Sequence, residues 1–192
     1  KQLSQKRNKA ALDLGKQVTT AMQDLSMAGG QLEIALLPLP EGGTHGLEQV
    51  EFLVAGHAGS TPRSLAKVAS GGELARISLA ISVITSKASF TPILIFDEVD
   101  AGIGGAVAET VGKLLRQLGQ SHQILCVTHL PQVAAQGNHH LKVSKSQAGD
   151  KTLSQVMPLG RSERVEEVAR MLGGATITDT TRRHARELLE QN

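Results

Sequence analysis

Aromatic residues are almost absent from this sequence, and sulfur is scarce. The 192 residues include three Phe, no Trp, no Tyr and a single Cys. The core must therefore be aliphatic, and stacking of nucleic-acid bases on aromatic side chains is disfavoured as a binding mode. One cysteine excludes an internal disulfide and a cysteine-rich zinc site, and it fits a reducing cytosol.

Long apolar runs, strong charge and a phosphate-binding loop are also missing. No apolar run is long enough to cross a bilayer, and no signal peptide opens the chain, so we expect no membrane partner. The net charge of +2 is too small to indicate a polyanionic partner by itself. The pattern G-x-x-x-x-G-K-[ST], which cradles nucleotide phosphates, does not occur. The chain starts at Lys1 with no Met, as a fragment of a longer protein would.

The sequence does contain an apolar run, 93–96, that leads directly into Asp97 and Glu98. Such a run predicts a strand buried on both faces of a parallel sheet, with the carboxylates emerging at its end. A helical pattern and a second apolar run, 123–128, follow and end at His129. Strand, helix and strand of these lengths predict a βαβ unit, which places His129 at the same sheet edge as the two carboxylates.

A pair of glycines opens another helical pattern, in the stretch Ser70-Gly71-Gly72-Glu73. One interpretation is a capping box, in which Ser70 and Glu73 satisfy the first backbone N–H groups. However, two glycines in the first turn cost about 1 kcal/mol each relative to Ala. The other interpretation is an anion site, because bare N–H groups at a helix N-terminus can hold a phosphate.

Together these pieces can serve phosphoryl transfer, provided that another segment holds the phosphates. Asp97 could hold Mg²⁺ directly or through water, since hard cations prefer oxygen ligands. Glu98 could orient and deprotonate an attacking water. His129 could contact a γ-phosphate. The missing phosphate-binding loop indicates that the nucleotide is cradled by another segment or another chain.

The remaining segments predict a mixed α/β architecture. Residues 1 to about 28 indicate a helix, either packed on the domain or forming the returning end of a coiled-coil arm. Its basic cluster is either a solvated face or a DNA contact (Lys1, Lys6, Arg7 and Lys9). Two antiparallel strands are expected at 31–37 and 49–55, separated by a turn cluster at 38–43. Beyond His129 we expect a hairpin around residues 147–150 and two helices, the second capped by Thr178.

In their order and spacing, these motifs resemble those of ABC-type ATPases. Ser70-Gly71-Gly72-Glu73 resembles the signature motif, and 93–98 resembles the Walker B strand with its catalytic glutamate. Asp100 falls in the corresponding D-loop, and His129 matches the switch histidine. Ala69 before the signature, with glutamate rather than glutamine at its end, is similar to the SMC and DNA-repair branch.

Three segments narrow the resemblance to the RecN family of bacterial recombination and repair proteins: 96–105, 128–135 and 169–174. The resemblance implies a C-terminal lobe of an ABC/SMC-type ATPase head, with a P-loop NTPase-like, mostly parallel sheet over 29–192. Residues 1–28 would be the returning end of the coiled-coil arm. Walker A would lie on the N-terminal half of the same head, so we expect this chain alone to be inactive as an ATPase.

The same resemblance implies cofactors, partners and roles. ATP and Mg²⁺ would bind where two heads form a homodimer. Ser70, Gly71, Gly72 and Glu73 would contact the nucleotide of the opposing head, whereas Asp97, Glu98 and His129 would serve the nucleotide of their own head. DNA would be the partner in double-strand break repair, in the bacterial cytoplasm at the nucleoid.

Two other classes of function stay open. The chain could come from the nucleotide-binding subunit of another ABC ATPase, of transporter or SMC type. The glutamate of the signature and the N-terminal helix argue against a transporter. Alternatively, it could be a non-catalytic interaction lobe, in which Asp97 and Glu98 merely end a strand.

Overall fold

The structure is a computed structural model that describes residues 1–68, 70–88, 91–148, 151–174 and 176–190. Ala69 and the hairpin tip at 149–150, both used in the sequence interpretation, lie outside the described residues. The chain divides into two compact units, Lys1–Val127 and Thr128–Asn192, and each is described by itself. Helices and strands are mixed along the chain, which confirms the predicted α/β fold class.

The first unit contains three helices and five strands among its described residues. Its helices are α1 (Gln2–Asp24), α2 (Gly71–Thr85) and α3 (Gly105–Leu118), with short 3-10 turns at Leu65–Lys67 and Ser86–Ala88. Its strands are β1 (Gln31–Gly43), β2 (Gly46–Ala55), β3 (Arg63–Ser64), β4 (Ile93–Phe96) and β5 (Gln123–Cys126). They form an antiparallel sheet in the order β1-β2-β3 and a parallel pair, β4-β5.

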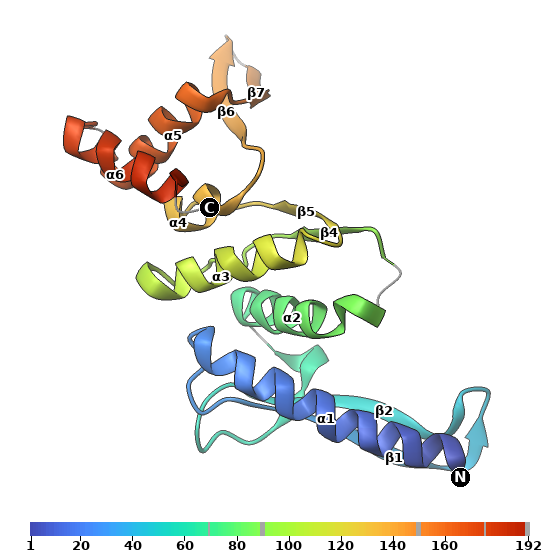
Figure 1. Cartoon of the computed structure of the whole chain (residues 1–192). Helices are drawn as coiled ribbons and strands as arrows, with labels where there is room; N and C mark the ends of the chain where they lie inside the picture. The colour runs from blue at the N-terminus through green and yellow to red at the C-terminus, as the bar shows by residue number, and fades with distance from the viewer. Residues whose placement is uncertain (69, 89–90, 149–150, 175, 191–192) are drawn as a thin grey trace. The chain divides into compact units, whose positions relative to one another are not determined.

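Helix α1 lies along the β1–β2 hairpin (Figure 1) and is attached to it by side-chain contacts. Val18 and Met22 are fully buried, and the Thr19 hydroxyl accepts the Leu32 N–H at 2.9 Å. The helix ends at Asp24, earlier than expected, because the chain turns through Ser26 at a φ of 62°. These contacts make the C-terminal half of α1 part of the first unit's core.

The β1–β2 hairpin is longer and tighter than the sequence indicated. The prediction that the first strand ends at residue 37 and is followed by a turn at 38–43 is wrong, since β1 continues to Gly43 and pairs there with Gly46. The register shifts between Pro38 and Gly43. Strand β1 lies at the edge of its sheet, so no further strand pairs with its outer side and its prolines are tolerated.

The predicted βαβ unit is confirmed. Ile93 pairs with Gln123 and Phe96 with Cys126 in parallel register, and α3 connects the two strands. The apolar face of α3 is buried (Ala108, Val111, Leu115 and Leu118). This geometry places the ends of β4 and β5 at one edge of the pair, where Val127 donates its N–H to the Phe96 carbonyl at 2.9 Å.

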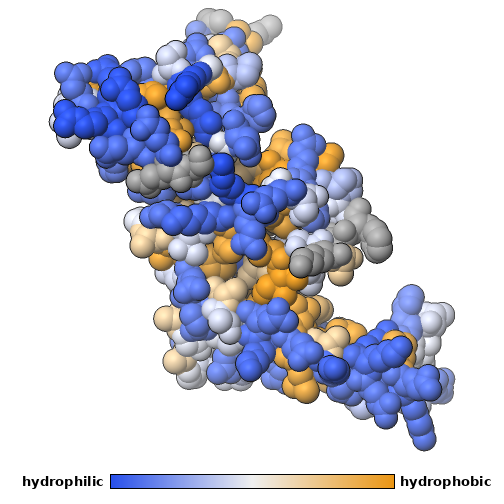
Figure 2. Space-filling model, in the orientation of Figure 1, coloured by the Kyte–Doolittle hydropathy of each residue, from blue (hydrophilic) through white to orange (hydrophobic). Residues whose placement is uncertain are grey.

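In the residues that the structure describes, the second unit combines a β-hairpin with three helices. Its elements are α4 (Pro131–Gln136), β6 (Leu141–Ala148), β7 (Lys151–Pro158), α5 (Arg161–Gly173) and α6 (Asp179–Glu190). The antiparallel β6–β7 pair confirms the expected hairpin. Helices α5 and α6 share a small core of Val168, Ala169 and Ala185, while the surface over them is mostly hydrophilic (Figure 2).

Candidate functional site at the end of β4

The two carboxylates emerge from β4 as predicted. Asp97 and Glu98 are both exposed and directly follow Phe96, which is 5% exposed. One carboxylate oxygen of Asp97, Oδ1, accepts the Glu98 N–H at 2.9 Å. Glu98 has a φ of 56°, in the left-handed region that residues other than glycine seldom adopt. The backbone therefore turns sharply at the residue that carries the second carboxylate.

A tight turn follows Glu98 and fixes the next residues. The Ala101 N–H donates to the Glu98 carbonyl at 3.0 Å. Val99 and Asp100 are buried, with Asp100 only 1% exposed. The position that corresponds to the D-loop aspartate thus lies inside the first unit, while Glu98 stays at the surface.

The thiol of Cys126 lies near these carboxylates at the end of β5. Burial, together with the negative charges of Asp100 and Asp97, raises the pKa of Cys126 to about 12. The thiol therefore stays protonated at neutral pH, which makes it a poor nucleophile. The shift also places Asp97 and Asp100 within electrostatic reach of the neighbouring strand.

The start of α2 shows the serine half of the predicted capping box. Ser70 is the N-cap residue, and its hydroxyl accepts the Glu73 N–H at 3.3 Å. The Ser70 carbonyl accepts the Leu74 N–H at 3.0 Å. Ser70 and Gly71 are exposed, whereas Gly72 is buried. The anion-site interpretation remains a prediction, and a capped serine is compatible with it.

The signature-like helix start lies directly against the turn that follows β4. A Cβ atom on Gly71 would lie 2.6 Å from Oε2 of Glu98, so the carboxylate occupies the space that a side chain would need. A Cβ atom on Gly72 would lie 3.1 Å from both the Cβ and the carbonyl oxygen of Ala101. The structure therefore brings Gly71 and Gly72 of the signature-like stretch against the Glu98–Ala101 turn.

Arg76 is a residue at this junction that the sequence analysis missed. It is 6% exposed, and its Nη1 donates to the Ala101 carbonyl at 2.9 Å. Burial lowers the pKa of Arg76, while the charge of Glu73 raises it. Among the described residues, its Nε has no hydrogen-bond partner. The only sequence signal is a lone arginine inside the apolar pattern of α2.

One face of the β4–β5 pair is open, which corrects the expectation of a strand buried on both faces. Ile95 is 70% exposed and Val127 is 62% exposed, and Ile93 and Leu125 are also exposed. These four residues alternate with covered ones, as the pleat of a strand requires. Within the described residues of the first unit, nothing covers this face. We call these four side chains the open face of the parallel pair.

His129 lies in the second unit, at the turn that precedes α4. The Leu130 N–H donates to the Thr128 hydroxyl at 3.0 Å, and Pro131 occupies the first turn of α4. His129 is exposed. Its role beside Asp97 and Glu98 remains a prediction, since those residues belong to the first unit.

The described residues include no group of three or more His, Cys, Asp or Glu side chains arranged to hold a metal ion. Asp97 nevertheless fits a Mg²⁺ ligand, because its carboxylate is exposed at a strand end and Mg²⁺ commonly takes only one or two carboxylates besides phosphate and water oxygens. None of the described helices is long and apolar enough to span a bilayer.

The fold of the chain is similar to that of solved SMC head domains. The chain is similar to an SMC head domain from Pyrococcus yayanosii, with a TM-score of 0.60 and 24% identity over 84% of this chain and 29% of that one. It is also similar to a structure described as an SMC ATPase with ATP-driven dimerization and DNA-stimulated activation. That match has a TM-score of 0.55 and 22% identity, and it covers 92% of this chain and 100% of that one. The fold of this chain is therefore similar to that of SMC head domains.

Sequence relatives then specify the family. DNA repair protein RecN from Xylella fastidiosa is 49% identical over 191 residues, which cover 98% of this chain and 34% of that protein. RecN from Vibrio cholerae is 48% identical over 97% of this chain, and RecN from Bacillus subtilis is 44% identical over 76%. No family model matches the chain.

Over nearly its whole length, the chain is therefore a RecN-type sequence, which confirms the resemblance drawn from its motifs. It spans about a third of the length of the curated relatives that it matches. The activity and partners of those whole proteins consequently enter below as proposals.

Proposed function

We propose that this chain is the C-terminal half of the ATPase head of a RecN-type protein. In this proposal the complete head binds ATP and Mg²⁺ and hydrolyses ATP at a dimer interface during recombinational repair of DNA double-strand breaks. Residues 1–28 are the returning end of the coiled-coil arm, and 29–192 form the lobe. The relatives are DNA repair proteins by name, which supports the process.

The open face of the parallel pair carries this proposal. Two parallel strands with an apolar face exposed to water form a sheet that lacks its remaining cover and neighbours, because parallel sheets are normally buried on both faces. Asp97 and Glu98 lie at the carboxyl end of this incomplete sheet, where α/β proteins bind ligands. A site with carboxylates but without a phosphate-binding loop requires a second segment, and the N-terminal half with Walker A would supply both the sheet and the loop.

Each residue of the site has a chemical role in the proposal. Asp97 contributes a carboxylate to Mg²⁺, either directly or through water, and the bound ion would supply charge neutralisation at the phosphates. Glu98 orients the attacking water and accepts its proton. His129 donates a hydrogen bond from its ring N–H to the γ-phosphate of the same nucleotide. Asp100 anchors the turn from inside the lobe.

The signature-like residues serve a second head. Ser70, Gly71 and Gly72 offer a hydroxyl and backbone N–H groups at the start of α2, which suits a phosphate held by the opposing subunit. Glu73 lies in the same first turn. The partners are thus the N-terminal half of the same head, a second head and DNA, in the cytoplasm of a bacterium.

Reconstitution tests the proposal. This chain alone should hydrolyse no ATP, and hydrolysis should appear when it is mixed with, or fused to, the N-terminal half that carries Walker A. Changing Glu98→Gln in the reconstituted protein should preserve ATP binding while lowering turnover by about 10²- to 10⁴-fold, the contribution of a general base. The measurements are phosphate release and binding of labelled ATP.

Different results would favour the other classes. Robust turnover by the isolated chain contradicts a split site, and unchanged turnover in Glu98→Gln removes the base role from Glu98. If Asp97→Ala leaves both ATPase and repair activity intact, the chain is a non-catalytic interaction lobe. Membrane-spanning segments upstream in the full reading frame would favour a transporter subunit.

A further inference from the structure

We propose that Gly71 also acts within its own lobe, where it sets the position of Glu98. This inference rests on the proposed function, because it assumes that Glu98 is the general base of ATP hydrolysis. It differs from the signature role, in which Gly71 contacts the nucleotide of the opposing head. A single glycine would then influence two nucleotide sites, its own and its partner's.

The first observation is the contact between the Glu98 carboxylate and the start of α2. A Cβ atom on Gly71 would lie 2.6 Å from Oε2 of Glu98. Side chains do not approach one another that closely, so any residue other than glycine at position 71 would displace the carboxylate. Gly71 has no positive φ that would itself require glycine. The requirement comes from the neighbouring carboxylate.

The second observation is that the contact belongs to a fixed junction rather than to a loose surface. Arg76 of α2 donates to the Ala101 carbonyl at 2.9 Å from a buried position. Gly72 packs against Ala101 so closely that a Cβ there would lie 3.1 Å from its carbonyl oxygen. The first two turns of α2 therefore hold the Ala101 end of this turn, and Gly71 lies beside the Glu98 carboxylate at the other end.

The physical consequence is a coupling between signature and base in the same head. Glu98 is exposed, so its carboxylate can move towards solvent in Gly71→Ala while the rest of the junction and the lobe stay folded. A displacement of about 1 Å at a reacting group can lower a rate by about 10²-fold. Gly71 is therefore a positioning residue for Glu98 as well as a ligand for the opposing nucleotide.

Mixed dimers of the complete protein separate the two roles of Gly71. Two differently tagged copies are co-purified, one with Gly71→Ala and the other with Asp97→Asn. The Asp97→Asn copy is inactive at its own nucleotide but offers an intact signature to the other copy. The Gly71→Ala copy keeps its own Asp97 and Glu98, so it hydrolyses ATP normally if Gly71 acts only on the opposing site.

The reference is a mixed dimer of an unaltered copy and an Asp97→Asn copy. We expect the Gly71→Ala dimer to turn over about 10- to 100-fold more slowly than this reference. When the same copy also carries Glu98→Gln, Gly71→Ala should not lower turnover further, because the carboxylate that it would displace is already absent. Turnover equal to the reference would overturn the inference and leave the proposed function intact.

Two controls keep the outcomes distinct. Gly43→Ala, where an added Cβ would meet only ordinary contacts at 3.6 Å and beyond, should match the reference and exclude a general effect of alanine. Full turnover by a dimer with Asp97→Asn in both copies would contradict the proposed function itself. That result is separate from the comparison that tests Gly71.

Discussion

The two units bury different kinds of side chain. Among the described residues of Lys1–Val127, the largest fully buried side chains are mainly aliphatic (Val18, Met22, Leu25, Ile77, Leu79, Val99, Val111 and Leu118). In the second unit, the fully buried residues of the α5–α6 core are one valine and two alanines, and larger aliphatic side chains pack against them while only partly buried (Val165, Leu172, Ile177, Leu188 and Leu189). Charged side chains surround that core, and Glu167 contacts both Lys142 and Arg170 at 2.6 Å.

This difference indicates which interactions contribute most to the stability of each unit. Burial of a large aliphatic side chain contributes about 1.5–3 kcal/mol, so the first unit depends on hydrophobic area. Valine and alanine bury less, so the second unit depends more on the ionisation of a few carboxylates and on hydrogen bonds at helix ends. The first unit should thus respond to cavities, and the second to pH and to loss of caps.

The largest effect should come from a cavity in the first unit. Met22 on α1 is fully buried. Met22→Ala should therefore lower the free energy of unfolding by about 2–5 kcal/mol. Hydrogen exchange followed by mass spectrometry should show faster exchange in residues 1–127 and little change beyond 128. Leu12→Ala on the same helix is the matched control, since Leu12 is 76% exposed and should change stability by less than about 0.5 kcal/mol.

An intermediate effect should appear when the second unit is acidified. Hydrogen bonding to Arg170, with a smaller contribution from Lys142, lowers the pKa of Glu167 from 4.5 to about 2. A lowered pKa in the folded state means stability that is present above pH 4.5 and is lost as the pH falls towards 2. Because the Lys142 and Arg170 side chains are partly exposed to water, screening should reduce this contribution to about 1–2 kcal/mol.

Urea unfolding at a series of pH values measures this effect, and Glu167→Gln is the comparison. The unaltered second unit should lose stability between pH 4.5 and 2, whereas Glu167→Gln should be less stable at neutral pH and should lack that part of the pH dependence. Parallel curves for the two proteins over this range would contradict the assignment to Glu167. They would also weaken the contrast between the units.

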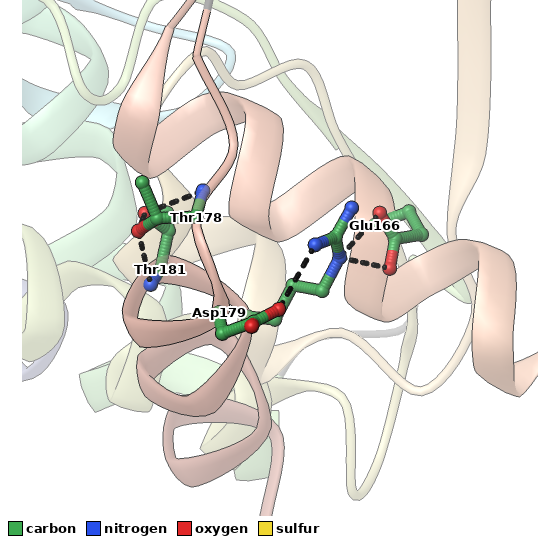
Figure 3. A network of polar contacts seen from close by, with 5 residues as sticks. Glu166, Thr178, Asp179 and Thr181 are labelled. Carbon is green, nitrogen blue, oxygen red and sulfur yellow. Dashed lines mark hydrogen bonds and ion pairs between the residues drawn. The ribbon is translucent and has the colours of Figure 1, made fainter.

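The smallest effect should come from the cap of α6. The Thr178 hydroxyl accepts the Thr181 N–H at 3.2 Å and lies 2.8 Å from the Thr181 hydroxyl (Figure 3). Thr178→Ala should cost about 1 kcal/mol and speed exchange in 179–190, whereas Thr178→Ser should retain most of the protection. Equal exchange in the two variants would show that the hydroxyl contributes nothing.

Features that depend on local sequence could be predicted here. The lengths of the apolar runs at 93–96 and 123–128 were sufficient to predict the βαβ unit. Ser70 and Thr178 were sufficient to predict where two helices begin. In each case the decisive interaction lies within a few residues or follows from strand periodicity.

Features that depend on distant neighbours could not be predicted. Pro38 is compatible with a strand only because β1 lies at a sheet edge. Ile95 is exposed because the described chain provides no cover for it, although its sequence pattern is that of a buried strand. Arg76 is buried because the carbonyl of Ala101, 25 residues away, accepts its hydrogen bond.

The backbone of Glu98 has a consequence for the evolution of this protein. A left-handed φ of 56° costs a residue with a side chain on the order of 1 kcal/mol, and glycine would avoid that cost. Selection for thermal stability alone would therefore enrich glycine at position 98. Selection that also demands ATP turnover would retain glutamate, so a deep mutational scan under the two regimes should diverge most sharply at this one codon.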